Sequence, residues 1–296
     1  MLIKKNTLDD KFILELAKIF KKQNWNIESS SEGEKSMFDM FCKRLEELEN
    51  DSDREFMLEL TCKYLVVDFE QYSTYITEIF RKLVTKEKEQ IKNIDTIHIF
   101  PIQDKDFPNK TKSGNVMCYL IQGIIMRRFE EFHDKRIRII ETYDGIKNNK
   151  NEISLLLLVD DFIGSGDTAL GCINLLEEIG VSKDKIRMLS LVAQETGKKV
   201  IEDYGVSIIN SITRNKAISD NYQKEEVEQK LEQMKRISKS IKVRDKNLFL
   251  GYKDSEGLVS MIKTPNNTFP FYWYECMKNG RGLSTKVCKL FITSPF

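Results

Sequence analysis

The stretch from Leu155 to Thr168, Leu-Leu-Leu-Leu-Val-Asp-Asp-Phe-Ile-Gly-Ser-Gly-Asp-Thr, constrains the fold more than any other part of the sequence. Its five consecutive apolar residues predict a strand buried on both faces, which is typical of a parallel sheet covered by helices. Two aspartates and a short glycine-rich polar turn follow, and a helical pattern begins directly after them. Because open α/β sheets bind ligands beyond the carboxyl ends of their strands, this order predicts a site for a phosphorylated sugar.

The sequence around this motif predicts an α/β fold with a doubly wound, mainly parallel sheet. Short apolar segments that read as strands occur at residues 96–102, 137–142, 186–193 and 206–212. Helical patterns separate these segments, and such alternation is typical of strands joined by helical crossovers.

The first part of the chain has a different pattern. No proline occurs before Pro101, and apolar residues recur at helical spacing through the first hundred residues. We therefore expect a helical N-terminal subdomain at residues 1–88 and a sheet domain at residues 89–296. Residues 144–151, which are rich in glycine and asparagine, predict a mobile loop just before the motif.

Composition excludes several classes of protein. The formal net charge is +1, so no general basic field draws in nucleic acid. The six cysteines form no Cys-x-x-Cys pair and the chain has two histidines, which argues against a zinc site and fits free thiols in a reducing compartment. No signal peptide and no long apolar window is evident, so we expect a cytoplasmic protein.

The aspartates and the turn offer groups suited to different parts of a sugar phosphate. Asp160 and Asp161 could accept hydrogen bonds from sugar hydroxyls or hold a solvated metal ion. The turn offers backbone amides, hydroxyl groups and a helix start to a phosphate, through Gly164, Ser165, Gly166, Asp167 and Thr168. The Asp167 carboxylate would repel a phosphate unless it points outward or caps the helix. A structural turn in which the aspartate pair caps the helix is the alternative reading.

Residues 159–168 resemble, position by position, the motif that binds phosphoribosyl pyrophosphate (PRPP) in type I phosphoribosyltransferases. Gly164 and Asp167 differ from the Thr and Gly that many members carry. The resemblance implies that Asp160 and Asp161 bind the ribose hydroxyls as the catalytic pair, with Mg²⁺ associated through ligand or water. It also implies that the substrate-binding residues of the turn are Ile163, Gly164, Ser165, Gly166, Asp167 and Thr168.

The same resemblance suggests further contacts to pyrophosphate. In the family, an earlier strand ends in a loop that contacts pyrophosphate, and Gln103 and Asp104 occupy that place here. Residues 112–115, just before a helix, could supply charge and backbone donors to the same phosphates, although a loop lysine such as Lys112 is more often simply solvated. The family's mobile catalytic loop would correspond to residues 143–150.

A second resemblance lies near the C-terminus. Residues 264–270, Thr-Pro-Asn-Asn-Thr-Phe-Pro, and residues 251–255, Gly-Tyr-Lys-Asp-Ser, are similar to segments of phosphoribosyltransferase-like proteins from bacterial conflict and anti-phage systems, including retron-associated ones. Asn266 and Asn267 could hydrogen-bond a base or a phosphate. Fixing a turn between the two prolines is an equally good reading.

Two functions remain open at the level of sequence. The first is an enzyme that binds PRPP or a related nucleotide with Mg²⁺ and transfers or cleaves at ribose C1, as a nucleotide-targeting effector in antiviral defence. The alternative is a catalytically inactive module that senses PRPP or a nucleotide, or binds a partner. The helical N-terminus could dock a protein or nucleoprotein partner in either case. Direct nucleic-acid binding has little support, because the sequence shows no basic segment and no helix-turn-helix signature.

Overall fold

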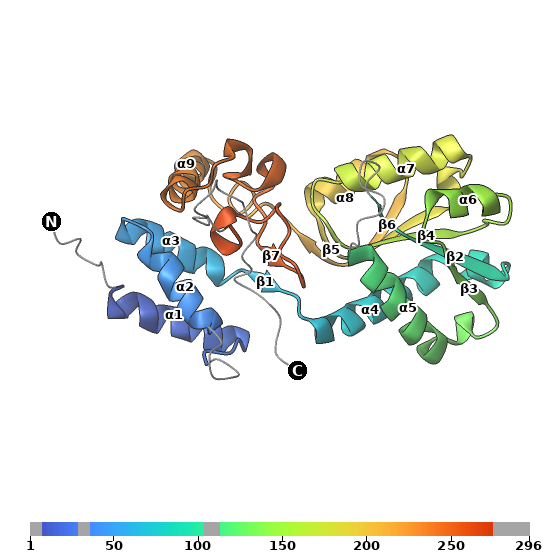
Figure 1. The fold of residues 1–296 in the computed structure, drawn as a ribbon, viewed down its shortest axis with the longest axis horizontal. Coiled ribbons are helices and arrows are strands. Elements are labelled where there is room, and N and C mark those ends of the chain that lie inside the picture. The colour runs from blue at the N-terminus through green and yellow to red at the C-terminus, as the bar shows by residue number, and fades with distance from the viewer. Residues whose placement is uncertain (1–7, 29–35, 104–112, 275–296) are drawn as a thin grey trace, which may run out of the picture. The chain divides into compact units, whose positions relative to one another are not determined.

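The computed structural model describes residues 8–28, 36–103 and 113–274, and only the backbone at residues 126 and 127. The chain forms two compact units. The sheet unit comprises Phe69–Asn215, and the helical unit combines Met1–Asp68 with Lys216–Phe296 (Figure 1).

A parallel sheet forms the centre of the sheet unit. Within the described residues it has five strands in the order β3, β2, β4, β5, β6, and every neighbouring pair is parallel. The strands are β2 (Thr96–Pro101), β3 (Arg136–Ile139), β4 (Leu156–Ile163), β5 (Ile186–Gln194) and β6 (Ser207–Arg214).

Helices cover both faces of this sheet, as Figure 1 shows. On one face lie α4 (Phe69–Lys92) and α5 (Ser113–Arg128). On the other lie α6 (Tyr143–Asn149), α7 (Asp167–Ile179) and α8 (Glu195–Asp203), and the short 3₁₀ turns of this unit are η1 (Glu130–Phe132) and η2 (Lys183–Lys185). The predicted doubly wound parallel α/β fold is therefore confirmed.

The central strand β4 follows from its apolar sequence. Leu156 and Leu158 are fully buried and pack in one hydrophobic cluster with α6, α7 and α8. Leu157 and Val159 are also fully buried, and because side chains alternate along a strand they belong to the opposite face of the sheet. Each such side chain contributes roughly 1.5–3 kcal/mol of transfer free energy when buried. The strand continues to Ile163, so both aspartates lie within β4 rather than in the turn after it.

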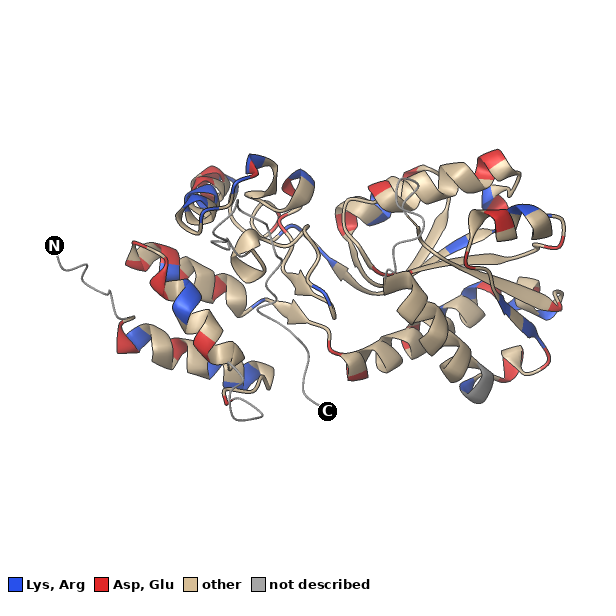
Figure 2. Cartoon of the chain, in the orientation of Figure 1, with Lys and Arg blue, Asp and Glu red and all other residues tan. Residues whose placement is uncertain are grey.

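The helical unit contains the expected amphipathic helices. Its elements are α1 (Asp10–Gln23), α2 (Met37–Glu46), α3 (Asp51–Thr61), β1 (Leu65–Val66), α9 (Lys224–Ser240), β7 (Val259–Ser260) and the 3₁₀ turns η3 (Lys246–Leu248), η4 (Tyr252–Asp254) and η5 (Pro270–Tyr272). The predicted apolar stripe of α1 is buried, with Leu16 and Phe20 fully enclosed. Acidic and basic residues are intermixed along the helices (Figure 2), in agreement with the balanced net charge.

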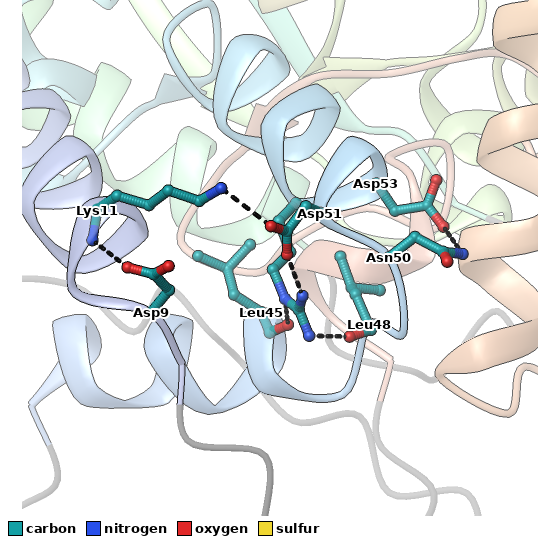
Figure 3. A network of polar contacts seen from close by, with 8 residues as sticks. Asp9, Lys11, Leu45, Leu48, Asn50, Asp51 and Asp53 are labelled. Carbon is teal, nitrogen blue, oxygen red and sulfur yellow. Dashed lines mark hydrogen bonds and ion pairs between the residues drawn. The ribbon is translucent and has the colours of Figure 1, made fainter.

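A buried arginine closes the connection between α2 and α3. The guanidinium of Arg54 donates to the carbonyl of Leu45 in the last turn of α2, to the carbonyl of Leu48 just after it, and to the carboxylate of Asp51 at 2.6 Å. Asp51 also accepts from Lys11 of α1 at 2.9 Å (Figure 3). These contacts satisfy carbonyls that the end of a helix leaves without intrahelical partners, and they tie three helices together.

The C-terminal segment belongs with the N-terminal helices. Strand β7 pairs in parallel with β1, and the rings of Tyr64 and Tyr272 stack with centroids 4.1 Å apart. Arg44 of α2 donates to the backbone carbonyl of Tyr274. The observed units therefore divide the chain near residues 68 and 215, which differs from the single boundary expected at residues 88 and 89.

The segment just before β4 is helical, so the prediction of a mobile loop at residues 144–151 is wrong. Thr142 caps α6 by accepting a hydrogen bond from the backbone of Gly145 at 3.1 Å. Ile146 is fully buried in the core under α7. The cap and this burial outweigh the weak helix propensity of glycine and asparagine.

Candidate functional site

The candidate site lies at the carboxyl end of β4, in the middle of the sheet. The chain builds β2 and β3 on one side of β4 and then β5 and β6 on the other, so β4 and β2 flank the point where the strand order reverses. Ligands of open α/β sheets bind at such a switch point. Asp160 and Asp161 occupy this end of β4, as the sequence predicted.

Each aspartate accepts a hydrogen bond from a hydroxyl group of a different helix. The Ser113 hydroxyl, at the start of α5, donates to Asp160 Oδ1 at 2.6 Å. The Tyr72 hydroxyl, in the first turn of α4, donates to Asp161 Oδ2 at 2.6 Å. The backbone N–H of Asp161 also donates to Asp160 Oδ1, at 2.9 Å. The carboxylates are thus held by donors and kept from turning freely.

The two carboxyl groups are energetically costly to ionise together. Burial raises the pKa of both Asp160 and Asp161, and the neighbouring charge of Asp161 raises the pKa of Asp160 further. The hydrogen bonds from Ser113 and Tyr72 lower these pKa values again, because they favour the ionised forms. The pair would gain from a cation or from hydroxyl donors of a ligand, since either would offset the repulsion.

The turn after β4 presents an open helix terminus. Gly166 is the N-cap of α7 with φ 85°, a left-handed conformation that favours glycine, and it has no side chain that could accept from the first turn. The Ser165 hydroxyl lies 3.5 Å from the backbone nitrogen of Asp167, the longest distance at which it can accept a hydrogen bond. Ser165 donates to Asp167 Oδ2 at 2.9 Å, while Asp167 and Thr168 have exposed side chains. The amides of the first turn of α7, together with the positive end of the helix dipole, therefore suit an anion.

A glycine from another segment sets the position of this turn. Gly197, in the first turn of α8, packs so closely that a Cβ placed on it would lie 2.1 Å from the carbonyl oxygen of Gly164. The same Cβ would lie 3.0 Å from the backbone nitrogen of Gly166. Any larger residue at position 197 would push the turn away from α8.

The predicted pyrophosphate contacts are only partly described. The Gln103 side chain is buried and donates to the carbonyl of Glu141, and the Gln103 carbonyl accepts from the hydroxyl of Tyr143 at 3.2 Å. This amide therefore holds the end of β2 against the segment after β3. Asp104 and Lys112 lie outside the described residues.

Three further residues that the sequence proposed as ligand contacts, Ile163, Asn266 and Asn267, lie in surroundings unlike those of the turn. The Ile163 side chain is buried in the core, so what it can offer a ligand is its backbone. Asn266 and Asn267 belong to the helical unit, where their carbonyls accept hydrogen bonds from the backbone of Tyr252 and from Gly257, both at 2.9 Å. Among the described residues the Asn267 Nδ2 atom has no hydrogen-bond partner.

Three residues of the site were not predicted from the sequence. Tyr72 lay on an apolar stripe that predicted nothing beyond packing in the N-terminal subdomain. Ser113 was expected only within residues 112–115, as part of a segment that supplies charge and backbone donors to phosphates, and not as a side-chain partner of Asp160. Gly197 lay in a short helix far from the motif. In the described ranges no group of three or more His, Cys, Asp or Glu side chains could hold a metal ion by itself.

Comparison with known proteins supports the sequence resemblance at the level of the family. A family model described as PRTase-CE matches residues 41–279. No curated protein sequence is a significant match. Across the described ranges, no helix combines the length and hydrophobicity that crossing a bilayer requires.

Several solved structures are similar at low identity. A hypoxanthine-guanine phosphoribosyltransferase from Schistosoma mansoni in complex with IMP is 14% identical, with a TM-score of 0.35, over 54% of this chain and 77% of that chain. An orotate phosphoribosyltransferase from Aeropyrum pernix is 14% identical, with a TM-score of 0.30, over 67% and 93% of the two chains. The orotate phosphoribosyltransferase from Mycobacterium tuberculosis H37Rv, in complex with inorganic phosphate, is 13% identical, with a TM-score of 0.29, over 48% of this chain and 71% of that chain. Because these TM-scores are low, only the family match bears on the function of this chain.

Proposed function

Because this chain belongs to the PRTase-CE family, we propose that it binds PRPP or a related nucleotide at the carboxyl end of β4. One observation carries this proposal. A pair of held carboxylates and an open helix terminus lie within nine consecutive residues, at the switch point of the sheet. Asp160 and Asp161 accept hydrogen bonds from the ribose hydroxyls, and residues 163–168 surround the 5′-phosphate.

The donor set fits Mg²⁺ only together with ligand or water oxygens. Asp160 and Asp161 supply hard carboxylate oxygens, and their mutual repulsion favours a nearby cation. Two carboxylates fall short of a complete coordination shell, which agrees with an ion that is shared with the ligand. When bound, Mg²⁺ would neutralise charge on the leaving pyrophosphate.

The reaction we propose is substitution at ribose C1. The bond between C1 and the pyrophosphate oxygen breaks with its electron pair on oxygen, and a nucleophile forms the new bond to C1 and releases its proton to solvent. The negative charge of Asp160 and Asp161 stabilises the cationic sugar, so no histidine is needed. Cleavage of a nucleotide uses the same site, with water as the nucleophile and the base as the leaving group.

The finer parts of the proposal rest on sequence. The C-terminal segments support a role as an effector in anti-phage or retron-associated defence, in the cytoplasm, with the N-terminal helices as the docking element for a protein or nucleoprotein. Five further residues remain predictions as ligand contacts, and these are Gln103, Asp104, Lys112, Asn266 and Asn267. A site that binds PRPP or a nucleotide without turnover is the alternative, and the same residues would then serve a sensor.

The binding part of the proposal is tested by thermal unfolding with Mg²⁺ and PRPP. At a ligand concentration about one hundred times the dissociation constant, we expect the melting temperature to rise by about 5–10 °C. Asp160→Asn combined with Asp161→Asn should abolish this rise. As a matched control, Asp134→Asn with Asp203→Asn changes two exposed carboxylates of the same unit and should leave the rise intact. A rise of equal size in the first double variant would contradict the assigned site.

Turnover is tested separately. The wild-type protein is incubated with Mg²⁺ and PRPP plus each common base, and with each common nucleotide, and released pyrophosphate or base is measured. Release above the level of the Asp160→Asn, Asp161→Asn variant supports the enzyme. Binding without release for any acceptor or nucleotide supports the sensor.

A further inference from the structure

Tyr72 contacts the candidate site from a helix that the sequence placed elsewhere. We propose that Tyr72 is a positioning residue, whose phenol holds Asp161 in the orientation that receives a ribose hydroxyl. The inference rests on the proposed function, because it assigns Tyr72 a role in the sugar half of that site. Tyr72 itself acts through Asp161 and does not need to touch the ligand.

The contact has the features of a strong hydrogen bond. The hydroxyl of Tyr72 lies 2.6 Å from Asp161 Oδ2, within the range for an O–H donor and an ionised acceptor. Tyr72 is 0% exposed and Asp161 is 7% exposed, so water competes little for either partner. A hydrogen bond of this kind in a water-poor site fixes the carboxylate far better than a surface contact does.

The tyrosine ring is itself held in place. It stacks on the ring of Phe69, three residues earlier in α4, with centroids 6.5 Å apart and planes 20° apart. The same helix buries Ile76, Ile79 and Leu83 further along, and α4 packs against β5 and β6 of the sheet. Because the ring cannot move without disturbing this packing, the phenol offers Asp161 a donor at a fixed position.

Packing alone does not account for the hydroxyl. A phenylalanine would fill the same space, and a buried hydroxyl costs free energy unless it has a partner. Here the partner is a carboxylate of the candidate site, in the same way that the Ser113 hydroxyl serves Asp160. The two carboxylates are therefore held from two helices, α4 and α5. The turn at residues 164–168, which we call the phosphate turn, instead lies between β4 and α7 and packs against α8.

This division predicts a selective effect on ligands. Loss of the phenol should release Asp161, which concerns the sugar, and leave the amides of the phosphate turn unchanged. Tyr72→Phe should therefore weaken binding of ribose 5-phosphate and of Mg²⁺–PRPP by about tenfold, the order expected for one hydrogen bond to a charged group. Binding of inorganic phosphate should change less than twofold. A general structural defect would weaken all three ligands together.

The experiment measures dissociation constants by calorimetry for the full-length wild type, Tyr72→Phe and a control. The control is Tyr119→Phe, which removes an exposed phenol (79% exposed) from α5. We expect wild-type values for Tyr119→Phe and a tenfold difference between sugar phosphate and phosphate for Tyr72→Phe. Melting curves of each variant show that it is folded.

The outcomes separate this inference from the proposed function. If the wild type binds the sugar phosphates and Tyr72→Phe binds them equally well, the inference is wrong and the proposed function stands. An equal loss for inorganic phosphate and for ribose 5-phosphate assigns Tyr72 a structural role and also overturns the inference. If the wild type binds none of the three probes, the proposed function fails, and the role of Tyr72 fails with it.

Discussion

The phosphate turn at residues 164–168 and the aspartate pair belong to one candidate site, but they are held in different ways. In the turn, Ser165 bonds to Asp167 two residues further on, and the helix begins in the same stretch of chain. These hydrogen bonds are local, so a short segment of sequence contains the groups that form them, although Gly197 of α8 packs against the turn. The turn is therefore recognisable without any knowledge of the rest of the fold.

The aspartate pair depends on distant segments. Asp160 receives its hydrogen bond from Ser113, 47 residues away, and Asp161 receives its own from Tyr72, 89 residues away. Burial by the surrounding helices also raises the pKa of both groups. The comparison teaches that adjacent residues of one motif can owe their properties to different levels of structure.

The largest effect is expected from Gly197→Ala, which tests how far the shape of the turn depends on its packing against α8. The new Cβ would lie 2.1 Å from the Gly164 carbonyl oxygen, so the turn or α8 must shift. We expect a loss of about 1–3 kcal/mol in the free energy of unfolding, together with a loss of phosphate binding measured by calorimetry.

Gly171→Ala is the matched control for this change. Gly171 lies within α7, and a Cβ placed there meets nothing within 4 Å. It should keep phosphate binding and raise stability by up to about 1 kcal/mol, through helix propensity. Unchanged phosphate binding in Gly197→Ala would show that the turn keeps its shape without α8.

A smaller effect is expected from Asp160→Asn, which tests the tertiary control of the pair. Because burial and Asp161 raise the folded-state pKa of Asp160, the folded protein keeps protons that the unfolded chain has already lost. Stability therefore falls as pH rises above the ordinary aspartate pKa of about 4. Asparagine keeps an acceptor for Ser113 but does not ionise, so it should raise the ligand-free melting temperature at pH 8.

The pH dependence distinguishes this explanation from improved packing. The advantage of Asp160→Asn should shrink as the pH is lowered towards about 4, because the folded aspartate is protonated there and the unfolded aspartate is also becoming protonated. Thermal unfolding between pH 4.5 and pH 8.5 measures this trend. An advantage that is the same at every pH, or a loss of stability at pH 8, would contradict electrostatic strain in the pair.

The smallest effect is expected from Asp167→Asn, which changes the local half of the site. Its exposed carboxylate lies in the first turn of α7, where it stabilises the helix but repels a bound phosphate. Removing the charge should tighten inorganic phosphate binding by about two- to fivefold at low salt. The gain should fade as ionic strength rises. Asp10→Asn changes the corresponding position of α1 in the helical unit and should have no effect on phosphate binding.

Most of the sheet unit could be predicted from the sequence, because its strands and crossover helices have strong periodic patterns. The division of the chain could not. Helix α4 has the same apolar spacing as α1 and α3, and nothing in that spacing says that it packs on the sheet. Tyr72 was therefore predicted to lie in the N-terminal subdomain, away from the site that it contacts. The helix at residues 143–149 was missed for a similar reason, since its cap and the burial of Ile146 offset poor propensity.

The sequence by itself determined the central strand and the turn after it, and it suggested the class of ligand that we propose, since these depend on the order of residues within about fifteen positions of the chain. Only the tertiary structure decided which groups hold the aspartates, how far their ionisation is shifted, and that a glycine of α8 supports the turn. Hydrogen bonds and burial between distant segments arise from packing, and packing depends on the whole chain. The motif is therefore local in origin, while the electrostatics of its carboxylates come from the fold.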